Sequence, residues 1–339
     1  MSKNIIVTGG AGYIGSHTVV KLVESGFNPI IIDNFSNSSP EIISRIELIC
    51  KKKIKTYNLN CSDQKKISEN INWNEIDGII HFAAYKSVSE SFKKKEEYFL
   101  NNIESTNILL RISEKYNINN FVFSSSCTVY GNPTTLPVTE KTELKKPSSP
   151  YGETKKICEE LIQCSAIKNF TILRYFNPIG AHESALIGEH PSNIPNNLVP
   201  LICECAIGKR EKLTIYGNDY STKDGTCIRD YIHVCDVAQA HVHALQNMIK
   251  KTKTKQIFNI GLSKGFSVLE LIKLFEKNNN IKIDYEFGKR REGDVEKIYA
   301  DCNLAKKELN WAPEKTIRIA LIDAWNWEKE KKNLRQIIL

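Results

Sequence analysis

Short apolar runs and stretches of helical periodicity alternate through the first half of the chain. A continuous apolar run predicts a strand buried on both faces, whereas apolar positions three and four residues apart predict one face of a helix. Helices are predicted over residues 96–116 and 151–165. The predicted strands cover residues 4–7, 29–32, 53–57, 76–84, 121–124 and 171–175. This alternation predicts an α/β fold with a doubly wound parallel sheet.

The regular alternation ends after Gly180, and residues 181–197 are loop-like. Beyond them, strands are predicted at 213–216 and 256–260 and helices at 198–207, 236–248, 268–277 and 303–309. We therefore expect two domains, residues 1–178 and a smaller mixed α/β domain at 179–339, with some later segments returning to the first. A ligand site is expected between the two.

Composition narrows the class of protein. A chain of 339 residues with 41% apolar content is long enough for one large domain or two closely joined ones. The net charge of +8 comes mostly from scattered lysines, such as those at 51–53 and 93–95, which are typical of a solvated surface. No basic strip is interleaved with aromatic residues, so nucleic acid is not a predicted partner. No apolar run approaches the roughly 20 residues of a membrane span.

The ten cysteines are dispersed along the chain. The closest pair, Cys203 and Cys205, has no second pair to complete a metal site, so no metal is predicted. Free thiols are typical of a reducing compartment. Because the N-terminus enters a predicted strand at once, there is no room for a signal peptide. The sequence therefore predicts a cytoplasmic protein.

A glycine-rich turn follows the first predicted strand. Gly9, Gly12 and Gly15 lie between that strand and a helix at the N-terminal end of the chain, which is the context of a dinucleotide-binding turn. They allow a tight turn, a close approach to a pyrophosphate and close packing of helix on sheet. Asp33 ends the next strand and suits the ribose hydroxyls of NAD rather than the extra phosphate of NADP.

A tyrosine and a lysine four residues apart, Tyr151 and Lys155, lie in a predicted helix and so on one of its faces. A neighbouring ammonium lowers the pKa of a phenol from its usual value of about 10, which suits proton transfer from an alcohol. The spacing alone is weak support, because Tyr285 and Lys289 repeat it in a segment with strand-like alternation. Ser126 follows the fifth predicted strand, so it is expected at the same sheet edge as Tyr151.

These features together resemble the extended short-chain dehydrogenase/reductase family. Later segments narrow the resemblance to its UDP-glucose 4-epimerase branch, and it covers nearly the whole chain. These segments are RYFNPIGAH at 174–182, IPNNL at 194–198, GNDY at 217–220, RDYIHV at 229–234 and RREGD at 290–294.

The resemblance implies an NAD-binding Rossmann domain, a UDP-sugar-binding domain and interconversion of UDP-glucose and UDP-galactose. Tyr151 would deprotonate the sugar 4-hydroxyl through Ser126. Lys155 would bind the nicotinamide ribose and, with the positive nicotinamide ring, lower the pKa of the phenol. NAD would stay bound while the 4-keto sugar turns over and receives the same hydride back. A homodimer through the helices at 96–116 and 151–165 is also implied.

Contacts are implied residue by residue. The substrate contacts would be Lys86, Ser126, Tyr151, Asn177, Asn197, Leu198, Tyr216, Arg229, Arg291, Asp294 and Ile298. The cofactor contacts, besides the glycines, Tyr151 and Lys155, would be Tyr13, Ile14, Asp33, Asn34, Phe35, Ser36, Asn37, Ser38, Asn60, Cys61, Phe82, Ala83, Ala84, Lys86, Asn101, Ser124 and Phe176.

The two arginines can clamp a diphosphate, although a structural ion pair explains them equally well. Asn60 replaces the family's usual aspartate beside adenine, and Cys61 replaces an aliphatic residue, so a modest effect on NAD affinity is expected. Ile298 occupies the family's size gate, where tyrosine excludes N-acetylated sugars and a small residue admits them. Its intermediate size leaves their acceptance open.

Two alternative functions share parts of this pattern. A nucleotide-sugar 4,6-dehydratase shares the platform but needs an Asp-Glu pair where this chain has Cys127 and Thr128. A non-catalytic NAD-sensing regulator would have no reason to keep Ser126, Tyr151 and Lys155 together. Both are therefore disfavoured against an epimerase.

Overall fold

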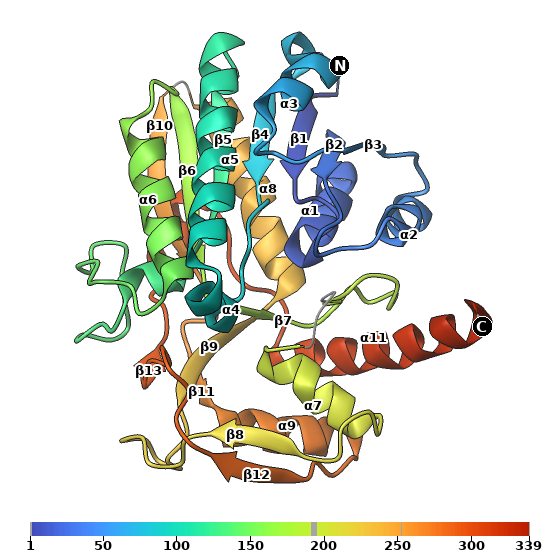
Figure 1. The fold of residues 1–339 in the computed structure, drawn as a ribbon, viewed down its shortest axis with the longest axis vertical. Coiled ribbons are helices and arrows are strands. Elements are labelled where there is room, and N and C mark those ends of the chain that lie inside the picture. The colour runs from blue at the N-terminus through green and yellow to red at the C-terminus, as the bar shows by residue number, and fades with distance from the viewer. Residues whose placement is uncertain (1, 191–194, 252, 339) are drawn as a thin grey trace.

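The computed structural model describes residues 2–190, 195–251 and 253–338. Its centre is a seven-stranded parallel sheet in the order β10-β6-β5-β4-β1-β2-β3 (Figure 1). The predicted α/β class with a doubly wound parallel sheet is confirmed. The strands are β1 (Asn4–Thr8), β2 (Asn28–Asp33), β3 (Lys55–Asn58), β4 (Gly78–His81), β5 (Asn120–Ser126), β6 (Asn169–Tyr175) and β10 (Thr254–Ile260).

Helices cover both faces of this sheet because its strand side chains are apolar on both faces. Alternate residues of β1 enter different cores, with Ile5 and Val7 on one face and Ile6 on the other. The first face is covered by α1 (Tyr13–Glu24), α2 (Glu41–Cys50) and α8 (Val234–Lys250). The second is covered by α3 (Gln64–Asn70), α5 (Lys95–Lys115) and α6 (Pro150–Cys164).

The strand order reverses between β1 and β4, so the loops that follow these two strands diverge at the carboxyl edge. Such a switch point opens a crevice where ligands bind. The loop after β4 leads into α4 (Val88–Lys93), and β5 leads directly into a short 3-10 turn at Cys127–Tyr130. The fold thus brings the glycine-rich turn and the serine-rich strand end to one edge.

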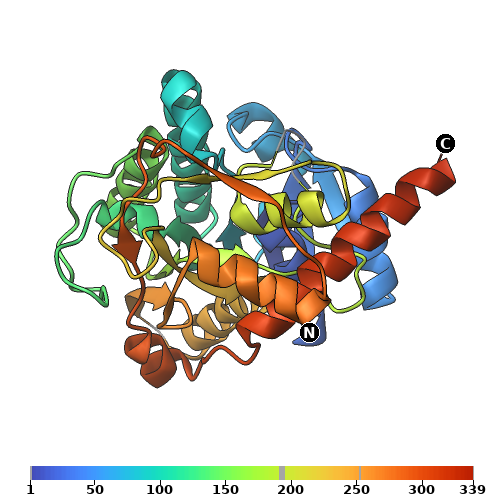
Figure 2. The same cartoon turned by 90° about the horizontal axis from the view of Figure 1, so that it is seen from below.

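A smaller mixed layer lies beyond that edge (Figures 1 and 2). It shares an apolar core to which Phe275 and Leu321 contribute without any exposure. Its helices are α7 (Leu198–Ala206), α9 (Val268–Asn279) and α11 (Ile317–Ile338), and α10 (Asn303–Leu309) packs nearer the main sheet. Its strands are β7 (Asn177–Ile179), β9 (Ile228–His233), β11 (Gly265–Ser267), β13 (Lys297–Ile298), β8 (Leu213–Tyr216) and β12 (Tyr285–Gly288).

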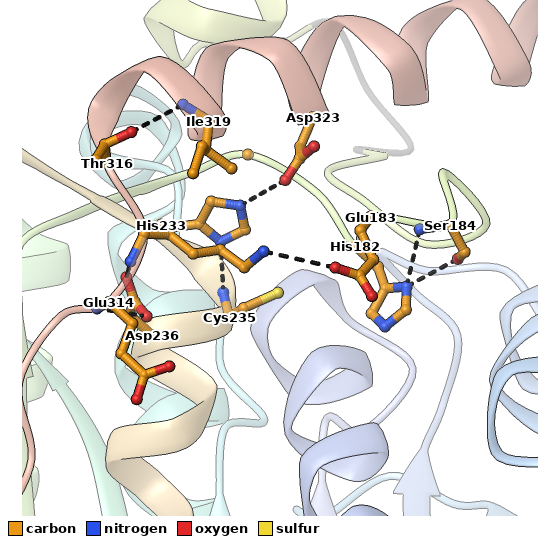
Figure 3. Close-up of polar contacts among 12 residues, drawn as sticks. His182, Glu183, Ser184, His233, Cys235, Asp236, Glu314, Thr316, Ile319 and Asp323 are labelled. Atoms are coloured by element: carbon orange, nitrogen blue, oxygen red, sulfur yellow. Dashed lines mark hydrogen bonds and ion pairs between the residues drawn. The ribbon is translucent and has the colours of Figure 1, made fainter.

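Helix α11 is attached to β9 through a buried histidine (Figure 3). His233 Nδ1 accepts a hydrogen bond from the Cys235 backbone N–H at 3.0 Å, which leaves the ring proton on Nε2. His233 Nε2 then donates to Asp323 Oδ2 at 3.1 Å. The pattern analysis predicted neither α11 nor β9. In β9 the polar Arg229 and Asp230 interrupt the apolar run that announces a buried strand.

Several predicted elements agree with those of the structure. The strand at 213–216 and the helix at 303–309 have the predicted limits. Tyr285 lies in β12, so the second tyrosine–lysine pair is not helical, as its alternation indicated. The loop predicted at 181–197 contains no helix or strand in its described part, and residues 191–194 lie outside that part. The domain boundary at 178 stays a prediction, although β10 and α8 do join the first layer.

A buried ion pair joins α6 to the sheet. Arg174 of β6 donates to Glu159 of α6 from Nη2 at 2.6 Å and from Nε at 3.0 Å. The hydroxyl of Ser125 in β5 donates to the same carboxylate at 2.5 Å, and Arg174 Nη1 donates to the Tyr130 hydroxyl at 3.2 Å. Both charged side chains are almost fully buried, at 3% and 1% exposure. One carboxylate therefore sets α6 against β5 and β6.

Removal of Glu159 should destabilise the fold strongly, because Arg174 would be left as an unpaired buried charge. For Glu159→Ala we expect a loss of about 3–5 kcal/mol in the free energy of unfolding, measured by urea denaturation. Glu160→Ala, at the neighbouring exposed position, is the control and should change stability by less than about 0.5 kcal/mol. Equal stability of the two variants would contradict this role.

Candidate active site

The glycine-rich turn is shaped by two close backbone approaches. A side chain at Gly9, whose φ is +68°, would place its Cβ 2.8 Å from the backbone nitrogen of Ala83. A Cβ on Gly15 would lie 2.2 Å from the carbonyl oxygen of Gly9. Only glycine fits either position. The turn therefore packs tightly against the end of β4 and presents bare backbone at the start of α1, where a pyrophosphate binds in dinucleotide folds.

Asp33, at the end of β2, joins that turn to the next loop. Its carboxylate accepts hydrogen bonds from the backbone N–H groups of Ala11 at 3.0 Å and Phe35 at 2.9 Å, and from the Ser38 hydroxyl at 3.0 Å. Burial raises the pKa of Asp33, and these three donors oppose the rise. The acid thus organises the rim of a cavity as well as lining it.

The first cavity extends from the glycine-rich turn to the start of α6. It encloses about 1260 Å³, its open mouth included. Bare backbone at a helix N-terminus with an acid at the end of the second strand is a donor and acceptor set that fits a dinucleotide. Of the predicted cofactor residues, those that line it are Gly9, Gly12, Tyr13, Ile14, Gly15, Asp33, Asn34, Ser36, Asn37, Ser38, Asn60, Cys61, Phe82, Ala83, Ala84, Lys86, Asn101, Tyr151 and Lys155.

Three predicted cofactor residues do not line this cavity. Phe35 has a left-handed backbone, with φ at +55°, in the loop after β2. Phe176 is buried in the core on the α1 side of the sheet, at 3% exposure. Ser124 lies inside β5 and offers its backbone carbonyl to Lys155. Their contacts with a cofactor stay predictions.

The departures from the family pattern beside the adenine end can now be described. Asn60 is exposed, and its side-chain oxygen accepts from the Ser62 backbone N–H at 3.0 Å. Cys61 is buried, and burial, with the nearby Asp33 adding to it, raises the pKa of its thiol to about 12. The thiol is therefore neutral and adds no charge to that end of the cavity.

The start of α6 carries the predicted catalytic pair. Ser149 caps the helix by accepting from the Gly152 backbone N–H at 3.2 Å, and Pro150 occupies the first turn, where a missing N–H costs nothing. A Cβ on Gly152 would lie 3.1 Å from the Thr128 carbonyl oxygen, so glycine lets the helix approach the loop after β5. Tyr151 is thereby held beside Ser126.

Tyr151 and Lys155 are both withdrawn from solvent, with 6% and 3% exposure. Lys155 Nζ donates to the Ser124 carbonyl oxygen at 2.7 Å and lies 4.7 Å from the centre of the Phe123 ring. Burial lowers the pKa of Lys155 to about 8, against the opposing effects of Cys158 and Glu159. The ammonium is therefore aimed at the sheet end and not at solvent.

The pKa of the Tyr151 phenol is raised, whereas the neighbouring ammonium was expected to lower it. Burial raises its pKa well above the ordinary value, nearby Tyr175 adds to the rise, and a hydrogen bond with Ser126 opposes it. Lys155 alone does not lower this pKa, because loss of hydration outweighs the attraction of one ammonium that bonds elsewhere. A further positive charge beside the ring is needed to make the phenolate accessible at neutral pH.

A second cavity adjoins the first, and a third adjoins the second. Ser36, Lys86 and Glu189 line both the first and the second. The second is lined by Asn177, Asn197, Arg229, Arg291, Asp294 and Ile298 among others, together with Cys127 and Thr128. The third shares Asn177, Asn197, Arg229, Arg291 and Asp294 with the second, and Leu198 and Tyr216 complete it. Of the predicted substrate residues, those that line these two cavities are Lys86, Asn177, Asn197, Leu198, Tyr216, Arg229, Arg291, Asp294 and Ile298. Tyr151 lines the first cavity, and Ser126 lines none of the three, so its contact with a substrate stays a prediction.

The arginines of this space share one carboxylate. Asp294 Oδ1 lies 3.0 Å from Arg291 Nη2 and 3.5 Å from Arg229 Nη2. The Arg291 guanidinium also lies 5.8 Å from the centre of the Tyr216 ring. The structure therefore shows the ion pair, which keeps two cations together in one cavity. The diphosphate clamp stays a prediction.

Comparison with known proteins agrees with this arrangement. The family model described as GDP-mannose 4,6 dehydratase matches residues 6–322. The UDP-glucose 4-epimerase of Haemophilus influenzae is 46% identical over 329 residues, which cover 96% of this chain and 97% of that protein. The chain belongs to the UDP-glucose 4-epimerases, within the extended short-chain dehydrogenase/reductase family.

Solved structures of this epimerase family superpose closely. The UDP-glucose 4-epimerase of Bifidobacterium longum, in complex with NAD+ and UDP, gives a TM-score of 0.93 at 40% identity, covering 98% of this chain and 99% of that one. The enzyme of Stenotrophomonas maltophila, with bound NAD and formylated UDP-arabinopyranose, gives 0.94 at 39% identity with the same coverage. The family resemblance inferred from the motifs is thereby confirmed.

Two cavity-lining residues of this epimerase chain, Tyr175 and Glu189, were not among the predicted site residues. Tyr175, at the end of β6, lines the dinucleotide cavity, and burial raises its pKa to about 12. Glu189 lines the two larger cavities from the loop after β7. A polar residue that ends a buried strand could have signalled Tyr175. Nothing local signals Glu189, because its loop has no periodicity.

The buried ammonium predicts a pH-dependent stability for the NAD-free protein. The pKa of Lys155 falls from 10.5 to about 8 on folding, so between these values the unfolded chain binds more protons at this position than the folded protein. The stability of the wild-type protein relative to Lys155→Met should therefore rise by about 2 kcal/mol between about pH 8 and about pH 10. Urea unfolding of both proteins across this range measures the difference, and a constant difference would contradict it.

Proposed function

We propose that the protein interconverts UDP-glucose and UDP-galactose as an NAD-dependent UDP-glucose 4-epimerase. One observation carries the proposal. Tyr151 and Lys155 line the dinucleotide cavity, while Cys127 and Thr128, which directly follow Ser126, line the adjoining cavity with the two arginines. A proton acceptor thus lies where a cofactor and a nucleotide sugar would meet. The identity of 46% to a UDP-glucose 4-epimerase over nearly the whole chain supports the same activity.

Bound NAD would supply reversible hydride exchange with C4 of the sugar, so the reaction would need no net oxidant. The chain contributes the surfaces that would hold it. The bare turn at Gly9, Gly12 and Gly15 would accommodate the pyrophosphate, and Asp33 would accept from the adenosine ribose. Lys155 would donate to the nicotinamide ribose from its place beside Ser124.

Proton transfer is the task of Tyr151. Its hydrogen bond with Ser126 provides a path for the 4-hydroxyl proton, and the dry surroundings hold the phenol protonated in the absence of a ligand. The positive charge that a bound oxidised cofactor brings would favour the phenolate. Tyr151 would thus become basic only when the cofactor is in place, and it would return the proton after the sugar has turned.

Anchorage of the nucleotide explains how the sugar could turn. Arg229 and Arg291 would hold the diphosphate, the ring of Tyr216 would lie near the uracil, and Asp294 would accept from the ribose. These groups line the third cavity, whereas Tyr151 lines the first. The 4-keto sugar would therefore be free to rotate while the UDP moiety stays bound.

Dehydratase chemistry is disfavoured although the matching family model bears that name. Elimination of water needs an acid and a base at the positions of Cys127 and Thr128. Burial raises the pKa of the Cys127 thiol to about 12, so it is neutral and a poor acid at physiological pH. A hydroxyl at Thr128 cannot serve as a carboxylate.

A homodimer through α5 and α6 belongs to the same proposal. Leu100 of α5 has 71% of its surface exposed and would be covered in such a dimer. A cytoplasmic location is also proposed, and the ten free cysteines support it. No helix among the described residues is long and apolar enough to cross a membrane.

Replacement of the proposed base should separate chemistry from binding. For Tyr151→Phe we expect the rate of conversion of UDP-galactose to UDP-glucose to fall about 10²–10⁴-fold, with little change in UDP affinity by calorimetry. Tyr285→Phe is a matched control, because Tyr285 repeats the spacing but is half-exposed in β12. Near-normal turnover in Tyr151→Phe would refute the role. A 4-keto-6-deoxy product from the wild-type protein would refute the epimerase.

Ile298 should set the tolerance for N-acetylated sugars. It is 4% exposed, lines the substrate cavity and belongs to β13, which pairs with β9 at Arg229. Because that pairing restrains the backbone, a larger side chain must occupy cavity space. The ratio of UDP-N-acetylgalactosamine to UDP-galactose turnover should fall about tenfold in Ile298→Tyr and rise in Ile298→Ala. An unchanged ratio in both variants would exclude Ile298 as the gate.

A further inference from the structure

Glu189 occupies the boundary between the cofactor and substrate cavities and has no role in the chemistry above. It lies in the loop that connects β7 to α7 and is 8% exposed. It lines the dinucleotide cavity, the substrate cavity and a small pocket beside Tyr13. A buried carboxylate between two cavities meant for anionic ligands needs a physical reason, because its charge repels both.

The contacts of Glu189 provide that reason. Its Oε1 accepts from Lys86 Nζ at 3.2 Å and from Asn197 Nδ2 at 2.7 Å. Lys86 comes from the loop after β4 and lines both larger cavities. Asn197 precedes α7 and lines the second and third cavities. One carboxylate oxygen therefore joins a residue of the cofactor side to a residue of the UDP side.

The backbone at Glu189 is itself held in place. Its carbonyl oxygen accepts from Trp327 Nε1 of α11 at 2.9 Å. A Cβ on Gly188 would lie 2.5 Å from the ring of Trp327, so the loop lies directly on that ring. Nearby, the Tyr13 hydroxyl donates to the Gly180 carbonyl at 2.6 Å. The carboxylate is thus presented from a segment whose backbone is held by these contacts.

We propose that Glu189 is a positioning residue that holds Lys86 and Asn197 in their ligand-binding orientations, and so joins cofactor retention to UDP-sugar binding. The inference rests on the proposed function for the identity of the two ligands. Lys86, at 43% side-chain exposure, is held by this carboxylate and by the Tyr13 ring, whose centre lies 5.8 Å from its Nζ. The amide nitrogen of Asn197 is directed at the same carboxylate.

Two substitutions separate geometry from charge. Glu189→Gln keeps an oxygen that can accept from Asn197 and Lys86 but removes the negative charge. Glu189→Ala removes both and leaves buried donors without a partner. If Glu189 acts by position, Glu189→Ala should weaken UDP binding about tenfold, and Glu189→Gln should stay within about threefold of the wild-type protein.

The measurement uses the purified NAD-containing protein. Calorimetry gives UDP affinity, extraction after dialysis gives retained NAD, and kinetics with UDP-galactose give KM and kcat. In Glu189→Ala we expect a raised KM, retained NAD reduced at least about threefold and kcat per bound NAD within about threefold, since no reacting group is altered. Glu183→Gln is the control in the same loop. Its side chain is 77% exposed and pairs only loosely with Lys315, at 3.8 Å (Figure 3).

Each outcome supports or overturns the positioning role of Glu189. Wild-type UDP affinity and NAD content in Glu189→Ala would overturn the proposal. Tighter UDP binding in both variants would mean that the negative charge of Glu189 repels the nucleotide. Equally weakened UDP binding in both variants would mean that Glu189 acts through its charge. Either result would overturn the positioning role. Because UDP affinity and NAD content are measured directly, an inactive wild-type protein would refute the proposed reaction without deciding the role of Glu189.

Discussion

The buried contact between Arg174 and Glu159 supports the arrangement of the whole site. Glu159 is one helical turn beyond Lys155 on α6, and its carboxylate also accepts a hydrogen bond from the Ser125 hydroxyl. The helix that carries the tyrosine and lysine is therefore fixed to the strand that ends in Ser126. In a low-dielectric interior such a pair is stable only with near-complete hydrogen bonding. Here the guanidinium is also bonded to Tyr130, so the geometry is specific.

Burial then gives the site its chemical character. A phenol, a thiol and an ammonium are all withdrawn from water beside the substrate cavity, and each is driven toward its neutral form. The neutral phenol cannot abstract a proton, so Tyr151 would need a positive charge beside it to act as a base. A bound oxidised cofactor would supply that charge, and reactivity would then depend on its presence.

The comparisons show that proteins with this fold are named for two different reactions. A model that bears a dehydratase's name matches almost the entire chain, whereas the similar full-length relatives are epimerases. The residues after Ser126 distinguish them, because an uncharged Cys127 and Thr128 cannot carry out elimination. Function in this family is thus decided by a few side chains on a common platform.

The sequence alone determined the parallel sheet, the glycine-rich turn and the helical spacing of Tyr151 and Lys155, because these depend on local periodicity and on residues close together in the chain. Tertiary structure decided the rest. Asp230 is buried by bonding to the backbone N–H groups of Leu262 and Ala300, so β9 was hidden from pattern analysis. Glu189 meets Lys86 across 103 residues. Such contacts depend on where the folded chain places distant side chains, which no local pattern of apolar and polar residues encodes.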